Sequence, residues 1–319
     1  MGQTINQSHL QLEGAPRKDT SIKRILMSGA SGPIGAALVP SLKQTGAEVV
    51  RLVRNPAAEV GQISWDPARE LAPAAVSGFG AVLHLAGEGV VARWTDAKKK
   101  AIRESRVRGT QSVATALART ESKPGVFVCA SAVGFYGDRD DEVLTEESAS
   151  GSGFLPEVCR EWEEASRICA AAGIRTVNVR IGLVLSAQGG ALARMLPIFK
   201  LGLGGRFGSG KQWWSWIHVD DIVGAIHHVL RTGDIAGAVN LVAPNPLRNE
   251  EFTKVLASAV RRPALFPVPE FALGAAFGRT AAKELFLSSQ RVQPAKLMAT
   301  QYAFRFADLR QALNDLLRD

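Results

Sequence analysis

Three glycines stand at the spacing by which a chain approaches a diphosphate group. The segment GASGPIG places them at Gly29, Gly32 and Gly35, directly after the apolar run at 24–28 and before an apolar helix that closes at Gly46. In such a strand–turn–helix unit the first glycine permits the tight turn, the second admits the diphosphate and the third lets helix and strand pack closely. The N–H groups at the helix start then face the anion. We therefore predict a dinucleotide site, with a plain strand-to-helix turn as the alternative.

Two arginines predict which dinucleotide binds. The second strand, AEVVRLVR, contains Arg51 and ends at Arg54, without an acidic residue between them. A carboxylate at this point, roughly 20 residues beyond the glycines, would favour NAD, whereas a guanidinium suits a 2′-phosphate by charge and forked geometry. We expect NADP rather than NAD; an exposed arginine at a strand end is the alternative. The predicted cofactor-binding residues are Gly29, Ser31, Gly32, Pro33, Ile34, Gly35, Arg51, Arg54, Leu85, Ala86 and Gly87.

Four further residues predict where a substrate would lie. Glu88 and Arg93 follow the apolar strand GAVLHLAGE and stand at a strand end. Lys211 and Trp214 lie in the glycine-rich, aromatic segment 186–216, whose flexible glycines suit a lid. A lysine could bind an anionic ligand and a tryptophan could stack on a ring, although tryptophans that pack a lobe junction are the alternative.

Two polar side chains after the next strand are candidates for catalysis. Ser131 and Tyr136 lie in VFVCASAVGFYG, residues 126–137, where a strand passes into a turn. Each has a structural alternative: a hydrogen bond to backbone for the serine and a packed turn aromatic for the tyrosine. His84, inside its own strand, is expected to be a packed core histidine.

The order of elements predicts the fold class. Strands alternate with helices up to a sixth strand, IRTVNVRIGLVL, which indicates an α/β protein with a doubly wound parallel sheet, the Rossmann fold, and a smaller C-terminal α/β substrate lobe. We expect a disordered leader at 1–22 and an NADP-binding domain at 23–185, its sheet completed by parts of 217–245. Residues 186–319 form mostly the substrate lobe.

Local signals predict how two helices begin and which residues of a third helix face solvent. Asp220 and Asp221 are expected to cap the helix that follows WSWIHV, and Asn249 the helix that starts with NEEF. Three acidic residues of the helix FLPEVCREWEEA are expected to form a solvated face: Glu161, Glu163 and Glu164.

Composition excludes several classes of protein. The chain has 319 residues, 46% of them hydrophobic, and a net charge of +8. Its charges are scattered, and Lys98–Lys100 share a helix with acidic residues, so we expect a solvated face and no nucleic-acid partner. No apolar run approaches the ~20 residues of a membrane span, and the polar N-terminus lacks a secretory signal. The three cysteines have no metal-ligand spacing, so we expect reduced thiols and no metal. The lack of a membrane span and of a secretory signal leads us to expect no membrane partner and a cytoplasmic location.

Several long motifs resemble one family. GASGPIG, HLAGE, ASAVGFYG and WIHVDDI resemble the landmarks of extended short-chain dehydrogenases/reductases. HLAGEGVVARWTDAKKKAIRESRVRGT, GGALARMLPIFKLGLGGRFGSGKQWWSWIHVDDI and NPLRNEEFTKVLASAVRRPALFPVP are similar to the atypical epimerase family, described as sugar-nucleotide epimerase-like or YfcH-like. The resemblance runs from about Lys23 to the C-terminus. It implies a lid at 186–216, and relatives pair into dimers through helices equivalent to 95–119 and 156–172.

The resemblance also implies a departure from the family's chemistry. Typical members use a Ser, a Tyr and a Lys for proton transfer beside the nicotinamide. Motif alignment puts Leu155 at the Tyr position, Cys159 at the Lys position and Ala132 near the Ser position. We therefore predict an NADP-binding oxidoreductase or epimerase-like protein with a non-standard site, acting on an unknown small molecule for which a nucleotide sugar is the candidate. The alternative is a non-catalytic, NADP-dependent regulatory or redox-sensing protein.

Overall fold

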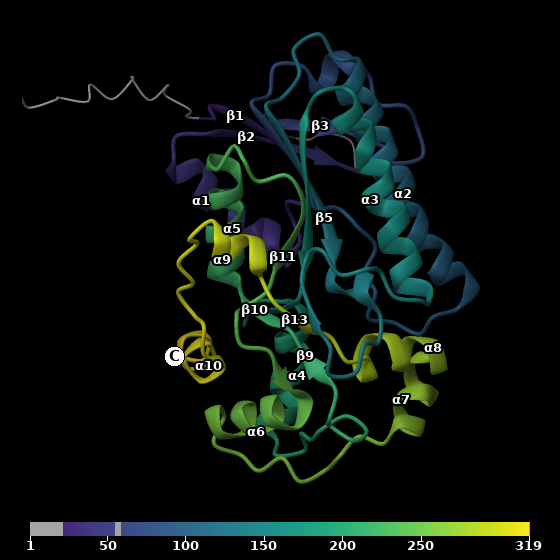
Figure 1. Cartoon of the computed structure of the whole chain (residues 1–319), viewed down its shortest axis with the longest axis vertical. Coiled ribbons are helices and arrows are strands. Elements are labelled where there is room, and N and C mark those ends of the chain that lie inside the picture. Colours follow the sequence, from purple (N-terminus) through teal and green to yellow (C-terminus); the bar gives the residue numbers. More distant parts are fainter. Residues whose placement is uncertain (1–21, 55–58, 319) are drawn as a thin grey trace, which may run out of the picture.

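The computed structural model describes residues 22–54 and 59–318, so nearly all of the expected leader lies outside the described residues. Its centre is a seven-stranded sheet in the order β11-β7-β5-β4-β1-β2-β3, in which every neighbouring pair is parallel (Figure 1). The strand order reverses between β1 and β4, which is the switch point of a doubly wound sheet. The predicted fold class is confirmed. The strands are β1 (Arg24–Ser28), β2 (Glu48–Val53), β3 (Gln62–Ser64), β4 (Ala81–His84), β5 (Val126–Ala132), β7 (Arg175–Ile181) and β11 (Gly237–Leu241).

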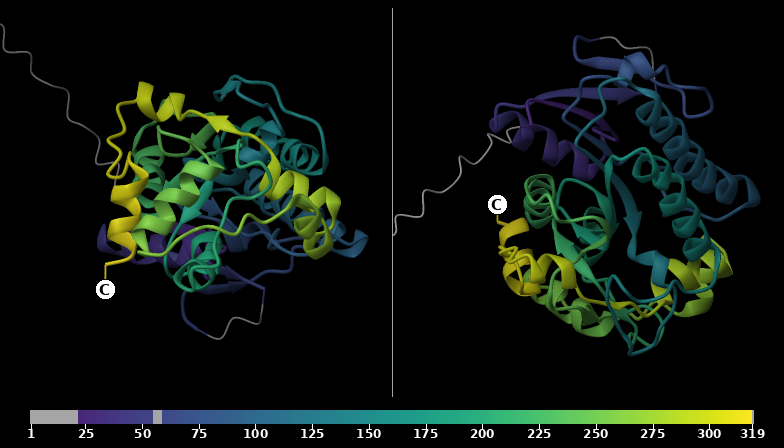
Figure 2. Two further views of the ribbon diagram at one scale, coloured as in Figure 1. Left: turned by 90° about the horizontal axis from the view of Figure 1, so that it is seen from below. Right: turned by 45° about the horizontal axis from the view of Figure 1, so that its top comes forward.

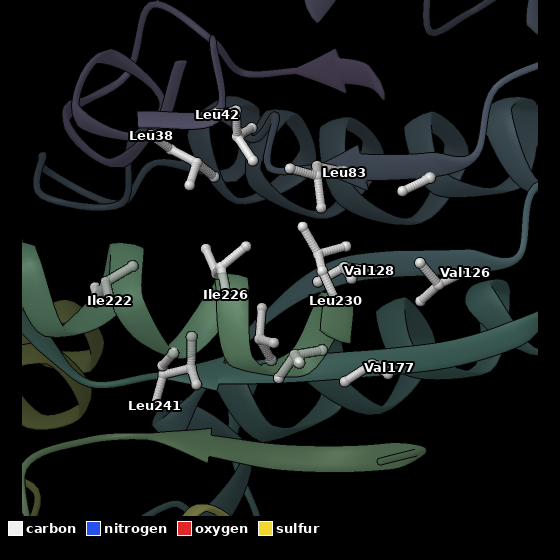
Figure 3. Packing of buried hydrophobic residues seen from close by; sticks show 14 of the residues in the cluster. Leu38, Leu42, Leu83, Val126, Val128, Val177, Ile222, Ile226, Leu230 and Leu241 are labelled. Carbon is white, nitrogen blue, oxygen red and sulfur yellow. The ribbon is translucent and has the colours of Figure 1, made fainter. Parts of the chain in front are cut away.

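Helices cover both faces of the sheet, which explains why its central strands are buried along most of their length. α1 (Pro33–Gln44) and α5 (Val219–Arg231) cover one face, and α2 (Asp96–Arg119) and α3 (Phe154–Ala171) cover the other (Figures 1 and 2). On the first face Leu38 of α1 and Ile226 of α5 pack toward Val128 of the sheet (Figure 3). On the second face Leu117 and Trp162 pack toward Phe127.

The C-terminal lobe has its own core, which is built from segments on both sides of β11. α4 (Gly190–Lys200), α6 (Asn249–Ala259) and α10 (Leu309–Leu316) enclose buried side chains such as Leu196, Phe252 and Leu313. The remaining helical elements are η1 (Pro73–Val76), η2 (Val133–Tyr136), α7 (Glu270–Phe277), α8 (Arg279–Ala282), the π-helical turn η3 (Lys283–Leu287) and α9 (Ala295–Ala299). The short strands are β6 (Val143–Leu144), β8 (Leu183–Leu185), β9 (Trp213–Trp214), β10 (Trp216–His218), β12 (Leu247–Arg248) and β13 (Arg291–Val292).

The predicted sixth strand is divided in two. β7 ends at Ile181, and β8 belongs to a separate pair with β10. Gly182 lies at the break, where a β-carbon would come within 2.6 Å of the Ser215 carbonyl oxygen. The chain leaves the sheet here because its backbone passes closely beside the segment that leads into β10.

Both helix-cap predictions were wrong in their residues. The N-cap of α5 is His218, whose Nδ1 accepts a hydrogen bond from the N–H of Asp220 at 3.0 Å. Asp221 is buried, and its carboxylate accepts the N–H groups of Arg305 (2.8 Å) and Phe306 (2.9 Å), so it fastens the C-terminal segment to α5.

At the start of α6, the N-cap is Arg248, whose N–H is accepted by the carboxylate of Glu251 at 3.1 Å. The Asn249 side chain turns inward, where its oxygen accepts the N–H of Phe207 at 2.7 Å. Sequence signals place the helix starts correctly, but long-range contacts decide which side chain caps the helix and which one bonds to a distant segment. No helix in the described ranges is long and apolar enough to span a membrane.

Candidate nucleotide-binding site

The three glycines form a turn with one open side. Gly29 has φ +73°, and a β-carbon there would lie 2.6 Å from the carbonyl carbon of Leu85. A β-carbon on Gly35 would lie 2.3 Å from the Gly29 oxygen, so both positions are filled by neighbouring backbone. At Gly32 the nearest atom would be 3.4 Å away, again the Gly29 oxygen. Only the middle glycine therefore leaves space for a ligand to approach the backbone.

The start of α1 faces this open side. Gly32 is the N-cap, Pro33 occupies the first turn, and that turn carries no acidic residue. Free N–H groups at a helix start attract anions, and proline tolerates this position because it has no N–H to satisfy. Ser31 and Pro33 are exposed and Ile34 is half-buried, so the predicted residues line an accessible cradle.

The opposite wall follows β4. The N–H of Leu85 is accepted by the Ser28 carbonyl at 3.2 Å, and that of Ala86 by the Ser28 hydroxyl at 3.3 Å. The same hydroxyl contacts Nδ1 of His84 at 2.8 Å. His84 is fully buried, as expected of a core histidine, and burial lowers its pKa to about 4. The imidazole is therefore neutral near pH 7 and holds the strand end that carries Leu85, Ala86 and Gly87.

The two predicted arginines differ in their surroundings. Arg51 is engaged with Glu59, with 2.5 Å between its Nη2 and the carboxylate oxygen. Arg54 is exposed at the end of β2, and its charge contributes to lowering the pKa of Glu88. Arg54 is therefore the guanidinium that remains available beside the crevice.

A cluster of charges, which the sequence did not reveal, surrounds Glu88. Lys98 of α2 lies 2.5 Å from its carboxylate, and this hydrogen bond is the main reason that the Glu88 pKa is lowered; Arg54 and Arg106 contribute by charge. The Lys98 side chain is only 22% exposed, so the prediction of a solvated face was wrong for this lysine. Three cations thus share one carboxylate at the carboxyl ends of β2 and β4.

Arg106 is the residue beside the candidate site that the sequence analysis most clearly missed. Its Nη1 donates to the Glu88 carbonyl at 2.9 Å, its guanidinium lies 5.0 Å from the Trp162 ring centre, and a β-carbon on Gly87 would be 3.3 Å from its Cζ. Burial lowers its pKa. A helical signal existed: Lys98, Ile102 and Arg106 recur at four-residue intervals and share one face of α2.

The candidate catalytic residues belong to a buried polar network. The Ser131 hydroxyl donates to Glu163 at 2.7 Å. Glu163 forms two contacts of 2.9 Å with Arg180, whose Nη1 also donates to the Tyr136 hydroxyl at 2.9 Å. That hydroxyl donates to Asn240 at 2.7 Å, and burial raises the Tyr136 pKa. The fully buried Tyr136 therefore has both its donor and its acceptor sites satisfied within the protein.

Of the three glutamates expected on a solvated face, one was predicted wrongly. The side chains of Glu161 and Glu164 are 44% and 67% exposed and pair with arginines on the surface. Glu163 is only 14% exposed and pairs with Arg180, which is 6% exposed. It turns toward the sheet because it lies one helical turn from Cys159 on the inward face.

The inward face of α3 carries neither a phenol nor an ammonium group. A β-carbon on Gly134 would lie 3.4 Å from Leu155, so this leucine packs against the turn after β5. The Cys159 thiol donates to the Ala132 carbonyl at 3.9 Å, and burial raises its pKa to about 12. Cys159 is therefore a neutral thiol near pH 7.

The other three residues predicted to contact substrate, Arg93, Lys211 and Trp214, have separate surroundings. Arg93 donates to the Ala275 carbonyl and so joins the loop after β4 to α7. Lys211 is exposed, whereas Trp214 packs its ring 5.3 Å from that of Phe252 in the lobe core. These contacts give Arg93 and Trp214 structural partners and leave Lys211 free to meet solvent. Within the described ranges, no group of three or more His, Cys, Asp or Glu residues could hold a metal ion.

The chain belongs to the NAD dependent epimerase/dehydratase family, whose sequence pattern matches residues 25–241, and the predicted resemblance is confirmed. A second pattern, the domain of unknown function DUF1731, matches residues 268–316. An epimerase family protein of Mycobacterium bovis is 38% identical, covering 91% of this chain and 96% of the relative. The crystal structure of human epimerase family protein SDR39U1 with NADPH is 35% identical with a TM-score of 0.84, covering 92% of this chain and 98% of that one. The structure of a nucleoside-diphosphate sugar epimerase from Corynebacterium glutamicum is 37% identical with a TM-score of 0.78; the match covers 93% of this chain and 59% of that one.

Proposed function

We propose that this protein binds NADP(H) at the switch point of its sheet and acts as an oxidoreductase or epimerase on an anionic, nucleotide-linked small molecule. The observation that carries the cofactor assignment is the open cradle at Gly32, bordered by three cations that share the single carboxylate of Glu88. An excess of positive charge beside a helix start is stabilised by a ligand that carries several phosphates. The NADPH in the human relative's structure supports the same assignment.

The residues present fit the cofactor. The diphosphate would lie against the N–H groups around Gly32, and the 2′-phosphate would be met by Arg54, since Arg51 is occupied by Glu59. Arg106 is held flat against Gly87, and among the described residues no partner is assigned to its Nε and Nη2. It is therefore suited to contact the diphosphate or the ribose on the nicotinamide side. When bound, the nicotinamide would accept or donate hydride.

Two side chains of the chain are candidates for its proton-transfer group. Leucine cannot transfer a proton, and a buried thiol with a raised pKa cannot replace a fixed ammonium group. Ser131 remains our first candidate because its hydroxyl is fixed at the end of β5 by Glu163. Tyr136 remains the second candidate, although proton transfer would require it to leave Arg180 or Asn240.

The inward face of α3 favours a second function, a non-catalytic protein whose NADP state regulates a partner. Leu155 and Cys159 remove the usual proton transfer, while the turn at Gly32 and the cations around Glu88 remain in place for the cofactor. The two functions share the same binding site, so cofactor binding tests both, and turnover separates them.

The cofactor assignment is tested by calorimetry with NADPH and NADH. We expect NADPH to bind at least tenfold more tightly, a difference of about 1.4 kcal/mol, and Arg54→Met to abolish most of this preference. Arg69→Met is the matched control, since this arginine is 84% exposed and pairs with Asp66 on the surface. Equal affinities in the unchanged protein, or a preference that survives Arg54→Met, would contradict the assignment of the 2′-phosphate.

The place of Arg106 is tested with a fragment of the cofactor. Arg106→Met should weaken NADPH at least tenfold and leave 2′,5′-ADP unchanged, whereas Arg54→Met should weaken both ligands. Arg106→Lys should recover part of the loss because it restores the charge without the forked geometry. If Arg106→Met binds NADPH like the unchanged protein, the residue only packs.

Turnover is tested by incubating the protein with a panel of nucleoside-diphosphate sugars and other anionic carbonyl compounds, while the absorbance of reduced nicotinamide is followed and the products are separated by chromatography. The chromatography is needed because an epimerase returns the hydride to its substrate and causes no net change in absorbance. Oxidation, reduction or epimerisation that is lost in Ser131→Ala supports the enzyme. Tight NADPH binding without turnover across the panel, together with a partner that is released by NADPH, supports the regulatory protein instead.

A further inference from the structure

Two segments of the C-terminal lobe form a surface that is both apolar and rich in basic residues, with Glu250 beside Gly210 and Glu270 beside Gly208 at its border. The segments are 190–212, which includes α4, and 252–269, which follows from α6 toward α7. Neither contains an aspartate or a glutamate; the acidic residues nearest to the second segment are Glu251 and Glu270, at its two borders. The seven cations are Arg194, Lys200, Arg206 and Lys211 in the first segment and Lys254, Arg261 and Arg262 in the second.

Large apolar side chains protrude from the same two segments. Their exposed fractions are well above those of core residues, and two reach nearly three quarters: Leu201 at 74% and Leu265 at 72%. The others are Ile198 at 52%, Leu203 at 55% and Phe266 at 56%. We refer to these five side chains as the apolar patch. Burying large apolar side chains stabilises proteins, so a patch left exposed beside cations indicates a binding surface.

Hydrogen bonds to backbone groups hold the two segments side by side. Arg262 Nε donates to the carbonyl of Lys200 at 3.0 Å. The N–H of Val268 donates to Arg206 at 2.8 Å, and the N–H of Gly208 donates to Val268 at 2.9 Å. The patch is therefore a preformed surface rather than two independent loops.

The charges around the patch are not neutralised within the chain. Ion pairs join many surface arginines and lysines of the described residues to carboxylates, but none of the seven cations takes part in one. Arg194, Arg206 and Arg262 instead donate to backbone carbonyls, which leaves their positive charge in place. A second copy of the chain on this face would bring like charges together, so the charge favours an anionic partner.

We propose that this face docks peripherally on an anionic lipid surface, with the apolar patch entering the interface and the cations meeting the headgroups. Figure 1 shows the connection between α6 and α7 at the lower end of the molecule, away from the sheet, so a flat surface can reach it. Leucine and phenylalanine side chains surrounded by lysine and arginine are the combination that binds a membrane interface without spanning it. The proposal does not depend on the cofactor, and it departs from the expectation from the sequence that no membrane partner exists.

Sedimentation of the full chain with vesicles tests the proposal. The vesicles are phosphatidylcholine alone, or phosphatidylcholine with about one third phosphatidylglycerol. We expect binding to the anionic vesicles that weakens as salt is raised and little binding to the neutral ones. Leu201→Ser with Phe266→Ser should weaken this binding at least tenfold, and so should Lys200→Glu with Lys254→Glu, which retains the apolar side chains.

Matched controls lie elsewhere on the surface. Val143→Ser replaces a side chain that is 48% exposed, and Lys100→Glu reverses an exposed lysine of α2; neither should change vesicle binding. Thermal unfolding by circular dichroism checks that each variant folds. The proposal is overturned if the unchanged protein ignores anionic vesicles at low salt, or if it binds them equally well after both double substitutions. It is also overturned if the patch substitutions instead convert a dimer into a monomer in analytical ultracentrifugation, because the occupant is then a second copy.

Discussion

Replacing Gly32 with alanine should separate cofactor binding from stability. Gly32 has φ −74° and ψ 167°, which alanine adopts without strain, and the added methyl would meet only the Gly29 oxygen, at 3.4 Å. We therefore expect the free energy of unfolding to change by less than about 1 kcal/mol. The same methyl stands on the open side of the turn, where the diphosphate would lie. NADPH should bind at least tenfold more weakly, a loss of about 1.4 kcal/mol or more.

Gly35→Ala provides the opposite case on the same turn. Its methyl would lie 2.3 Å from the Gly29 oxygen and 2.6 Å from Cα of Ala30, so backbone must move. Overpacking of this kind costs about 1–3 kcal/mol, which for a chain larger than 150 residues lowers Tm by roughly 2–4 °C per kcal/mol. Stability should fall together with affinity.

Urea unfolding of both variants measures their stability, and calorimetric titration measures their affinity for NADPH. If Gly32→Ala binds NADPH as tightly as the unchanged protein, the diphosphate does not lie over this turn. If Gly35→Ala unfolds at the same urea concentration as the unchanged protein, the close packing of α1 on the turn is not what requires glycine.

Three further outcomes test the packing around the site. Burial lowers the pKa of His84 to about 4 from an ordinary 6.5, so between these pH values the unfolded chain binds a proton that the folded chain does not. The free energy of unfolding should therefore rise by about 3 kcal/mol from pH 4 to 6.5. Urea titrations should show less of this rise in His84→Gln. Glu163→Gln leaves the Arg180 charge buried and should lower the free energy of unfolding by about 3–5 kcal/mol. Glu164→Gln on the surface should lower it by less than about 0.5 kcal/mol, and urea unfolding measures both values. Asp221→Asn weakens the attachment of the C-terminal segment and should cost about 2 kcal/mol, visible as faster limited proteolysis after α9; unchanged proteolysis would contradict this role.

The nucleotide-binding turn could be predicted from the sequence because all of its determinants are local. Gly29, Gly32 and Gly35 lie within one turn and one helix start, and backbone geometry gives each a separate reason to be glycine. The alternation of apolar strands and helices likewise predicted a doubly wound parallel sheet. Period and spacing carry this information without knowledge of distant contacts.

The polar network around Ser131 could not be predicted, because its members meet only after the sheet has formed. Glu163 is separated from Ser131 by 32 residues, and Asn240 from Tyr136 by 104. In the helix, Glu163 differs from Glu161 and Glu164 only in which way it faces. Its burial depends on Arg180, which the neighbouring strand presents to it.

Arg51 and Arg54 show the difference between what the sequence pattern predicts and what tertiary contacts decide. The sequence by itself determined that Arg51 lies in the second strand and Arg54 at its end, that three glycines stand at the start of the first helix, and that α3 would carry Leu155 and Cys159 in place of a phenol and an ammonium group. Tertiary structure alone decided that Glu59 occupies one arginine and that α2 brings Arg106 to the end of β4. The physical reason is that conformational preferences act between neighbours in the chain, whereas charge and burial depend on every group that folding brings within a few ångströms.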